Sequence, residues 1–333
     1  GQVAPRLGAD NAVREAERDV IRTTLRLGLA AQKLTLEEGR AAPAEGAVHT
    51  VMSVLRGAEG WLSKRGVDSP KRSAELLLGH VLKLDRLALY LEHDRPLNEE
   101  ERAAMRALVL RRGDGEPVAH LRGSWSFRGH ELEVGPAVLI PRPETEELVD
   151  VALAKLRAHG GTSVVDLGTG SGAIAIALAV EHPGLDVLGT DASQNALAVA
   201  RNNSEYHKVT DRLQLVHGSW WQPVPEGSQF DLVVSNPPYI DPKALDGLED
   251  DVQKFEPPLA LFSAPGDVAS CYRELASGLE RHLRPGGWLL VETGHLAASA
   301  SRDVFAELPF LVGVELLEDL GGQPRFVVAQ RQG

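Results

Sequence analysis

A strand that runs into a glycine-rich turn and then a helix is the strongest constraint on the fold of this chain. Val164-Val165-Asp166-Leu167 is an apolar strand with a carboxylate near its tip, and Gly168-Thr169-Gly170-Ser171-Gly172 follows it. Ala173 to Leu178 then form an apolar helix. Glycines allow the backbone to approach a nucleotide closely. The spacing differs from the dinucleotide fingerprint and lacks the lysine of a P-loop, which favours a nucleoside cofactor without a pyrophosphate.

The region from about residue 141 onward alternates strand and helix patterns. Helices are expected at about 144–158, 172–181, 193–204, 267–283 and 296–307. Seven strands are expected at 162–167, 186–190, 213–216, 230–235, 287–292, 312–317 and 325–329. This alternation predicts an α/β fold with a mostly parallel sheet covered on both faces. The last two strands are joined by too few residues for a helical crossover, so an antiparallel last strand is expected.

Three segments are predicted to precede this sheet domain, which spans residues 141–333. Residues 1–46 have the spacing of an amphipathic helix followed by a linker, and residues 47–112 that of a small helical bundle. In the bundle, Ser69-Pro70 marks a helix start, and Asn98 with Glu101 forms a capping box. Residues 113–140 contain glycine-punctuated strand patterns and are predicted to be a β-hairpin connector.

Composition narrows the class of partner and the compartment. The formal net charge is −12, which disfavours binding to a nucleic-acid backbone. Cys271 is the single cysteine, so no internal disulfide can form, and a reducing cytoplasm is expected. We find no apolar run of about 20 residues that could span a bilayer and no secretory signal pattern at the start of the sequence. The histidines show no metal-ligand spacing, so no metal is expected.

Asp191 ends the second predicted strand, about 20 residues beyond the last glycine of the turn. At that place a carboxylate can accept both hydroxyls of a ribose. The simpler role is capping of the helix that starts near Ser193. The combination with the glycine turn favours ribose binding.

Asn236-Pro237-Pro238-Tyr239 follows the apolar strand at 230–235. Two prolines stop strand pairing and stiffen the backbone, so an amide is held at the carboxyl end of a strand, where α/β sheets bind ligands. An amide has one acceptor and two donors and suits a planar amide or amino group. The motif indicates methyl transfer to nitrogen if a methyl donor lies nearby; the alternative is a proline-rich turn.

The glycine turn, Asp191 and the Asn-Pro-Pro-Tyr motif together resemble class I S-adenosylmethionine-dependent methyltransferases. Further motifs narrow the resemblance to the release-factor glutamine methyltransferase (HemK/PrmC) family, over about residues 48–329. These motifs are the run from Val138 to Val149, which contains Pro141-Arg142-Pro143-Glu144-Thr145-Glu146, and the segments 117–123, 256–261 and 319–322 with Arg325.

The family resemblance implies a seven-stranded Rossmann-like methyltransferase sheet and an activity. That activity is methyl transfer from S-adenosylmethionine, which becomes S-adenosylhomocysteine, to the side-chain amide nitrogen (N5) of a glutamine. The glutamine lies in the Gly-Gly-Gln motif of class I peptide-chain release factors, and the methylation supports translation termination. The helical domain at 47–112 is then expected to dock the substrate protein.

The resemblance also assigns site residues. The implied cofactor-binding residues are Asp166, Gly168, Thr169, Gly170, Ser171, Gly172, Asp191 and Trp220, with Trp221 as the competing choice against the adenine. Asp166 faces the amino acid end of the cofactor or tethers the glycine turn. Asn236, Pro237, Pro238 and Tyr239 hold the glutamine, with Asn236 and Pro237 as the catalytic pair.

The catalytic hypothesis is that the Asn236 side-chain oxygen and the Pro237 carbonyl accept the two N–H bonds of the substrate amide. Tyr239 packs on the glutamine stem, and the proton leaves to water after transfer. Arg142 and Glu144 are interpreted as structural or cofactor-side residues. Two other functions fit parts of the pattern: an adenine methylase, disfavoured by the acidic charge, and an inactive escort protein, disfavoured by the intact glycine turn.

Overall fold

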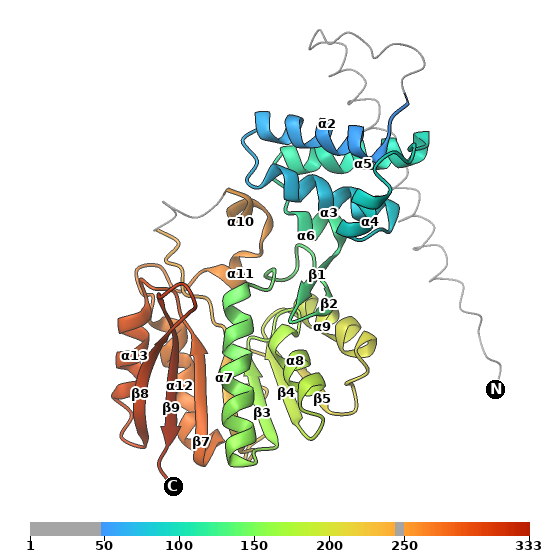
Figure 1. Cartoon of the computed structure of the whole chain (residues 1–333). Coiled ribbons are helices and arrows are strands. Elements are labelled where there is room, and N and C mark those ends of the chain that lie inside the picture. Colours follow the sequence, from blue (N-terminus) through green and yellow to red (C-terminus); the bar gives the residue numbers. More distant parts are fainter. Residues whose placement is uncertain (1–47, 244–249) are drawn as a thin grey trace, which may run out of the picture. The chain divides into compact units, whose positions relative to one another are not determined.

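The computed structural model describes residues 48–243 and 250–333. It forms two compact units, and the boundary between them in the sequence lies between Arg122 and Gly123 (Figure 1). The sequence patterns had predicted that the helical domain ends at residue 112. The helical extension predicted over residues 1–46 lies outside the described residues. Among the described helices, none is long and apolar enough to cross a membrane.

The described part of the first unit is helical. Its elements are α2 (Val51–Lys64), α3 (Pro70–Leu82), α4 (Arg86–Leu91), α5 (Glu99–Gly113) and α6 (Val118–Arg122). Their apolar faces share one core, in which Val51, Leu62, Leu77, Leu78 and Leu89 are completely buried. The amphipathic spacing seen in the sequence therefore produces a helical bundle with its own core.

Two helix starts in this bundle were predicted and are confirmed. Helix α3 begins at Pro70, although the side chain of Ser69 makes no capping hydrogen bond. Helix α5 begins with a full capping box. The Asn98 side chain accepts from the Glu101 backbone N–H at 2.8 Å, and the Glu101 carboxylate accepts from the Asn98 N–H at 3.0 Å.

The second unit begins with a two-stranded antiparallel hairpin. Its strands are β1 (Ser124–Phe127) and β2 (His130–Glu133). Their buried residues, Phe127 and Leu132, pack into the core of this unit. The hairpin thus occupies part of the predicted connector, whereas the preceding helix α6 belongs to the first unit.

The remaining strands form one seven-stranded sheet in the order β5-β4-β3-β6-β7-β9-β8. The strands are β3 (Ser163–Leu167), β4 (Asp186–Asp191), β5 (Leu213–His217), β6 (Phe230–Ser235), β7 (Leu283–Glu292), β8 (Leu311–Glu318) and β9 (Pro324–Arg331). The first five are parallel, and β9 runs antiparallel to both β7 and β8. This confirms the predicted mostly parallel sheet with an antiparallel last strand, and β9 inserts between β7 and β8.

Helices cover both faces of the sheet and make two cores (Figure 1). Alternate strand residues face opposite sides: Val164 joins the core that contains α7 and α8, whereas Val165 joins the core of α12 and α13. The helices are α7 (Pro143–His159), α8 (Ala173–Glu181), α9 (Gln194–Tyr206), α10 (Asp250–Phe255), α11 (Pro258–Leu261), α12 (Ser270–His282) and α13 (Ala298–Ala306). Short α10 and α11 were not predicted.

The strand order creates a switch point between β3 and β6. Strand β3 pairs with β4 on one side and with β6 on the other. The polypeptide passes from β3 through α8 to β4. Adjacent loops diverge at such a point, and the crevice outside the carboxyl ends of the strands accepts ligands. The glycine turn, Asp191 and Asn236 all follow strands that end at this edge.

A prediction about packing follows from Gly278, which faces Trp221 in the core. A Cβ at residue 278 would lie 2.5 Å from two atoms of the indole. We therefore expect Gly278→Ala to lower the free energy of unfolding by about 1–3 kcal/mol through overpacking. Gly57→Ala, on the exposed side of α2 with open space around it, is the opposite control and should stabilise its helix by about 0.5–1 kcal/mol. Denaturant unfolding of both variants measures this, and an unaffected Gly278→Ala would contradict it.

Candidate active site

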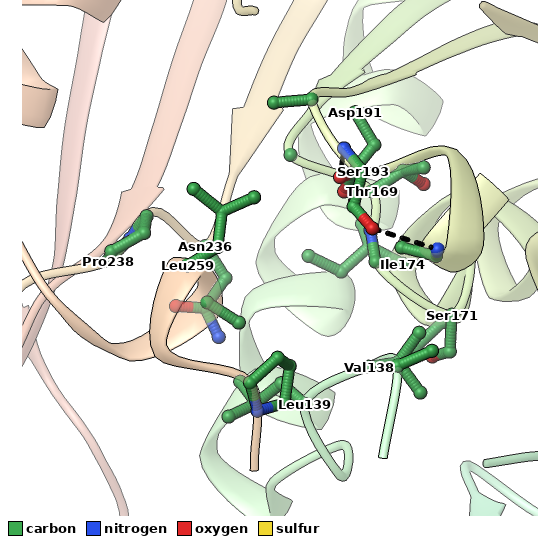
Figure 2. Close-up of a pocket in the computed structure, with 18 of the residues that line it drawn as sticks. Val138, Leu139, Thr169, Ser171, Ile174, Asp191, Ser193, Asn236, Pro238 and Leu259 are labelled. Carbon is green, nitrogen blue, oxygen red and sulfur yellow. Dashed lines mark hydrogen bonds between the residues drawn. The ribbon is translucent and has the colours of Figure 1, made fainter. Parts of the chain in front are cut away.

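A cleft of about 290 Å³ opens at the carboxyl edge of the sheet, within the second unit. Figure 2 shows Asn236 and Pro238 on one side of it and Thr169, Asp191 and Ser193 across from them. The segments that line it come from the loops after β3, β4, β5 and β6, the residues before α7, and the region of α11. Residues far apart in the sequence therefore build one cavity at the switch point.

The glycine turn wraps around the end of β3 with its backbone anchored to β4. The N–H groups of Gly168 and Thr169 both donate to the Thr190 carbonyl, at 2.8 and 2.9 Å. Gly170 has a positive φ of 57° and no atom within 4 Å of a hypothetical Cβ. A side chain at Gly170 would project into this free space, so glycine leaves room for a ligand beside the backbone.

Asp191 lies at the end of β4 and holds two loops in place. Its Oδ2 accepts from the Gly170 N–H at 2.8 Å, and its Oδ1 accepts from the Ser193 N–H at 2.8 Å. The helix cap of α9 is Ser193 itself, whose hydroxyl accepts from the Ala196 N–H. Burial raises the pKa of Asp191, and these two backbone bonds partly counter that effect. Each oxygen keeps a lone pair for a hydroxyl donor.

Asp166, in contrast, lies behind the turn. Its side chain is completely buried and does not line the cleft. Oδ2 accepts from the Thr169 hydroxyl at 2.6 Å, which tethers the turn through a side chain. The Ala175 backbone N–H also interacts with this carboxylate and favours its charged form. Burial and then the charge of Asp191 raise the pKa of Asp166 to about 7.

The two adjacent tryptophans have different positions. Trp220 is half-buried and lines the cleft, with its ring near Gly168. Its φ of +48° is unusual for a bulky residue, and its carbonyl accepts from the Thr190 hydroxyl. Trp221 is buried, donates to the Leu275 carbonyl at 2.8 Å and stacks on His282. Trp220 is therefore the tryptophan that can meet a ligand.

The Asn-Pro-Pro-Tyr segment leaves β6 next to the glycine turn. The Ser235 hydroxyl donates to the Leu167 carbonyl at 2.6 Å and ties the two strand ends together. Asn236 Nδ2 donates to Thr145 Oγ1 at 3.2 Å. Asn236 and Pro238 line the cleft, Pro237 is buried, and the Tyr239 ring packs over Gly294 beside the cleft. Burial raises the pKa of Tyr239 to about 12.

Arg142 has a structural partner that the sequence did not reveal. It forms an ion pair with Glu256 at 2.6 Å, and the same carboxylate accepts from the Ile140 N–H at 3.3 Å. Burial raises the pKa of Glu256, whereas the Arg142 charge acts to lower it. The pair joins two cleft walls, the 138–141 segment and the 257–262 segment, which supports the structural role predicted for Arg142.

Cys271 also lines the cleft, from α12. Its side chain is half-buried, and burial raises the pKa of its thiol. A neutral thiol is a weak nucleophile, so Cys271 contributes wall surface. Among the described residues, no three histidine, cysteine, aspartate or glutamate side chains are placed to hold a metal ion.

Comparison with known proteins agrees with this geometry. The PrmC N-terminal domain matches residues 53–123, and the methyltransferase small domain matches residues 147–250. The release factor glutamine methyltransferase of Geobacter sulfurreducens is 40% identical over 263 residues, which cover 79% of this chain and 90% of that protein. The chain belongs to the release factor glutamine methyltransferase family.

Two further relatives of the same description support membership. The Chlorobaculum tepidum protein is 39% identical and covers 82% of this chain and 94% of its own length. The Xylella fastidiosa protein is 43% identical, and the match covers 78% of this chain and 93% of that protein. The resemblance inferred from motifs is thereby confirmed, and the chain is an S-adenosylmethionine-dependent methyltransferase.

The cleft of this family member fits that cofactor by its own chemistry. Open space at Gly170 leaves room beside the backbone, and the Asp191 carboxylate has unused lone pairs at the cleft wall. A nucleoside with a cationic end matches a cleft that the described residues line with one carboxylate, Asp191, and no lysine.

Asp166 gives a prediction about pH and stability. Its folded-state pKa of about 7 exceeds the ordinary value of 3.8, so its contribution is complete below pH 4 and is lost as the pH rises through 7. We expect Asp166→Asn to flatten the fall in Tm between about pH 4 and pH 7, measured without cofactor. Asp186→Asn, at an exposed position, is the control. An unchanged slope for Asp166→Asn would contradict the burial argument.

Proposed function

We propose that this enzyme methylates the side-chain amide nitrogen (N5) of the glutamine in the Gly-Gly-Gln motif of class I peptide-chain release factors. The methyl donor is S-adenosylmethionine. The observation that carries the proposal is an amide side chain, Asn236, held at the wall of a cleft whose opposite wall carries Asp191. Membership of the release factor glutamine methyltransferase family supports this choice of substrate.

The substrate side of the site is formed by Asn236 and Pro237. The Asn236 Nδ2 group is already engaged by Thr145, which leaves Oδ1 as the acceptor for a ligand. Two acceptors on a rigid segment, this oxygen and the Pro237 carbonyl, match the two N–H bonds of a primary carboxamide. Pro238 and Tyr239 supply apolar surface for the glutamine stem.

The cofactor side is formed by the glycine turn, Asp191 and Trp220. Asp191 accepts hydrogen bonds from the ribose hydroxyls, and the backbone of Gly168 to Gly172 lies beside the nucleoside. The Trp220 ring, which lines the cleft, packs against the adenine. Asp166 acts on this side from behind the turn, which it supports through the Thr169 hydroxyl.

The chemistry needs orientation more than a strong base. A carboxamide nitrogen is a weak nucleophile because its lone pair is delocalised into the carbonyl. Bound S-adenosylmethionine supplies an electrophilic methyl group on a positively charged sulfur. Asn236 and Pro237 hold the nitrogen in line with that methyl group and stabilise the positive charge that develops on the N–H bonds. As the new carbon–nitrogen bond forms, the carbon–sulfur bond breaks, and the nitrogen releases one proton to water.

The partner class follows from the same proposal. Release factors act in translation termination, so we place the enzyme in the cytoplasm, as its cysteine content suggested. The net charge of −12 disfavours a nucleic-acid substrate. The helical first unit has no catalytic group of its own in this scheme, and we assign it to docking of the release factor.

Incubation of the enzyme with S-adenosylmethionine and a class I release factor tests the proposed function. We expect one methyl group per release factor, located by tandem mass spectrometry on the glutamine of Gly-Gly-Gln. A release factor with that glutamine replaced by alanine, a ribosomal protein and DNA are the controls. Methylation of DNA alone, or of the alanine variant at the same rate, would refute the proposal.

Asn236→Ala tests the substrate side of the site. It removes the acceptor for the substrate N–H, and we expect kcat to fall at least about 100-fold. Affinity for S-adenosylhomocysteine, measured by calorimetry, should stay within about threefold, because the change lies across the cleft from Asp191. Asn202→Ala is the matched control, since Asn202 is exposed and contacts Glu133. Near-normal turnover by Asn236→Ala would remove it from the mechanism.

A further inference from the structure

A short chain of hydrogen bonds runs from Asn236 through Thr145, which also lines the cleft, to the buried Glu292. Asn236 Nδ2 donates to Thr145 Oγ1 at 3.2 Å, and the Thr145 hydroxyl donates to Glu292 Oε2 at 2.7 Å. Asn236 follows β6, Thr145 lies in the first turn of α7, and Glu292 ends β7. Thr145 and Glu292 are almost completely buried, at 4% and 1% exposure. Three separate elements therefore meet behind one amide.

The chain of hydrogen bonds has a direction. When Glu292 is ionised, well above pH 7, its carboxylate can only accept hydrogen bonds, so the Thr145 hydroxyl uses its single proton toward Glu292. The threonine oxygen then has only lone pairs left for Asn236. Of the two polar groups of the Asn236 amide, only the NH₂ group can donate a hydrogen bond to the lone pairs of Thr145 Oγ1. The amide oxygen is thereby turned toward the other side.

The opposite amide orientation would be unproductive. If Asn236 turned its oxygen to Thr145, two acceptors would face each other, and the NH₂ group would point where the substrate N–H bonds must lie. Donor would then oppose donor, and the substrate amide would lose its acceptor. A site built to accept hydrogen bonds discriminates strongly when a buried polar group is left unpaired.

We propose that Thr145 and Glu292 are positioning residues that hold the Asn236 amide oxygen toward the substrate glutamine. This rests on the proposed function. Neither residue touches the reacting atoms in this scheme: Glu292 sets the direction of the Thr145 hydroxyl, and Thr145 sets the orientation of the Asn236 amide. Without the hydrogen bond between Thr145 and Glu292, the Asn236 amide could rotate and present either end to the substrate.

The surroundings of Glu292 are consistent with this role. Burial raises the pKa of Glu292 to about 7, opposed by the Thr145 hydrogen bond and by the charges of Arg325 and Arg142. The negative charge of Glu144 acts with burial to raise the pKa of Glu292. Tyr239 and Tyr272 also lie close enough to interact with the carboxylate. Well above pH 7 the group is the pure acceptor that the direction of the chain requires.

Two substitutions at Thr145 separate positioning from packing. Thr145→Val keeps the shape of the side chain but removes the hydroxyl, whereas Thr145→Ser keeps the hydroxyl and removes a methyl group. We expect Thr145→Val to lower kcat on a class I release factor about tenfold or more, well above pH 7, and Thr145→Ser to stay within about threefold of wild type. A packing role predicts the reverse order.

Two binding measurements accompany the rates. S-adenosylhomocysteine affinity should be the same in both variants, because Thr145 acts on the substrate side. The affinity of the enzyme–S-adenosylhomocysteine complex for the release factor should fall in Thr145→Val and should not fall in Thr145→Ser. If wild-type enzyme is active and Thr145→Val is as fast as Thr145→Ser, the positioning role is wrong while the proposed function stands. If wild-type enzyme neither binds nor methylates the release factor, the proposed function fails and this inference fails with it.

Glu292→Gln tests the second member of the pair. Glutamine has the same size, carries no charge and can either donate or accept, so the direction of the chain is no longer enforced. Well above pH 7 we expect a higher Tm, because a buried charge is removed, together with a lower kcat. A purely structural role would not raise stability and lower kcat together. Wild-type kcat in Glu292→Gln would overturn the role of the carboxylate.

Discussion

The parallel pairing of β3 with β4 and β6 determines where every polar group of the site emerges. All three strands end at the same edge of the sheet, and two sets of hydrogen bonds fasten those ends together. Thr190 at the end of β4 accepts from both Gly168 and Thr169, and Ser235 at the end of β6 donates to the last residue of β3. These bonds leave the glycine turn and the Asn236 loop on opposite sides of one crevice. A cofactor and a protein side chain can then meet there without any large rearrangement of the sheet.

The site keeps three acidic groups in positions where burial opposes their charge. Asp166, Glu256 and Glu292 are buried, and burial raises the pKa of each. Each one also organises a neighbouring loop: Asp166 holds Thr169, Glu256 holds Arg142 and Ile140, and Glu292 holds Thr145. Buried charges of this kind rarely add net stability, and they are best explained by the geometry that they impose. In this enzyme that geometry is the position of the cleft walls and the orientation of one amide.

Sequence patterns predicted the sheet well because its strands are apolar and its helices periodic. They also placed Asp191 and Asn236 at strand ends, where the structure has them at the wall of the cleft. Patterns could not choose between Trp220 and Trp221, because the choice depends on a backbone turn with positive φ at Trp220. The sequence patterns assigned no role to Thr145 or Glu292, and they did not identify a partner for Arg142. Those contacts join residues 91, 147 and 114 positions apart, and only the packing of α7 and the loop before α11 against the sheet brings them together. The roles of the site residues toward cofactor and substrate stay predictions.

In the proposed reaction, one cleft holds the cofactor on the Asp191 side and a glutamine amide on the Asn236 side. A crystal structure with S-adenosylhomocysteine and a peptide that contains Gly-Gly-Gln tests it most directly. We expect the ribose hydroxyls within hydrogen-bond distance of Asp191, about 2.7 Å, and the glutamine nitrogen at about 2.9 Å from both Asn236 Oδ1 and the Pro237 carbonyl. A glutamine side chain bound elsewhere, or one whose carbonyl oxygen faces Asn236 in place of its nitrogen, would contradict the account.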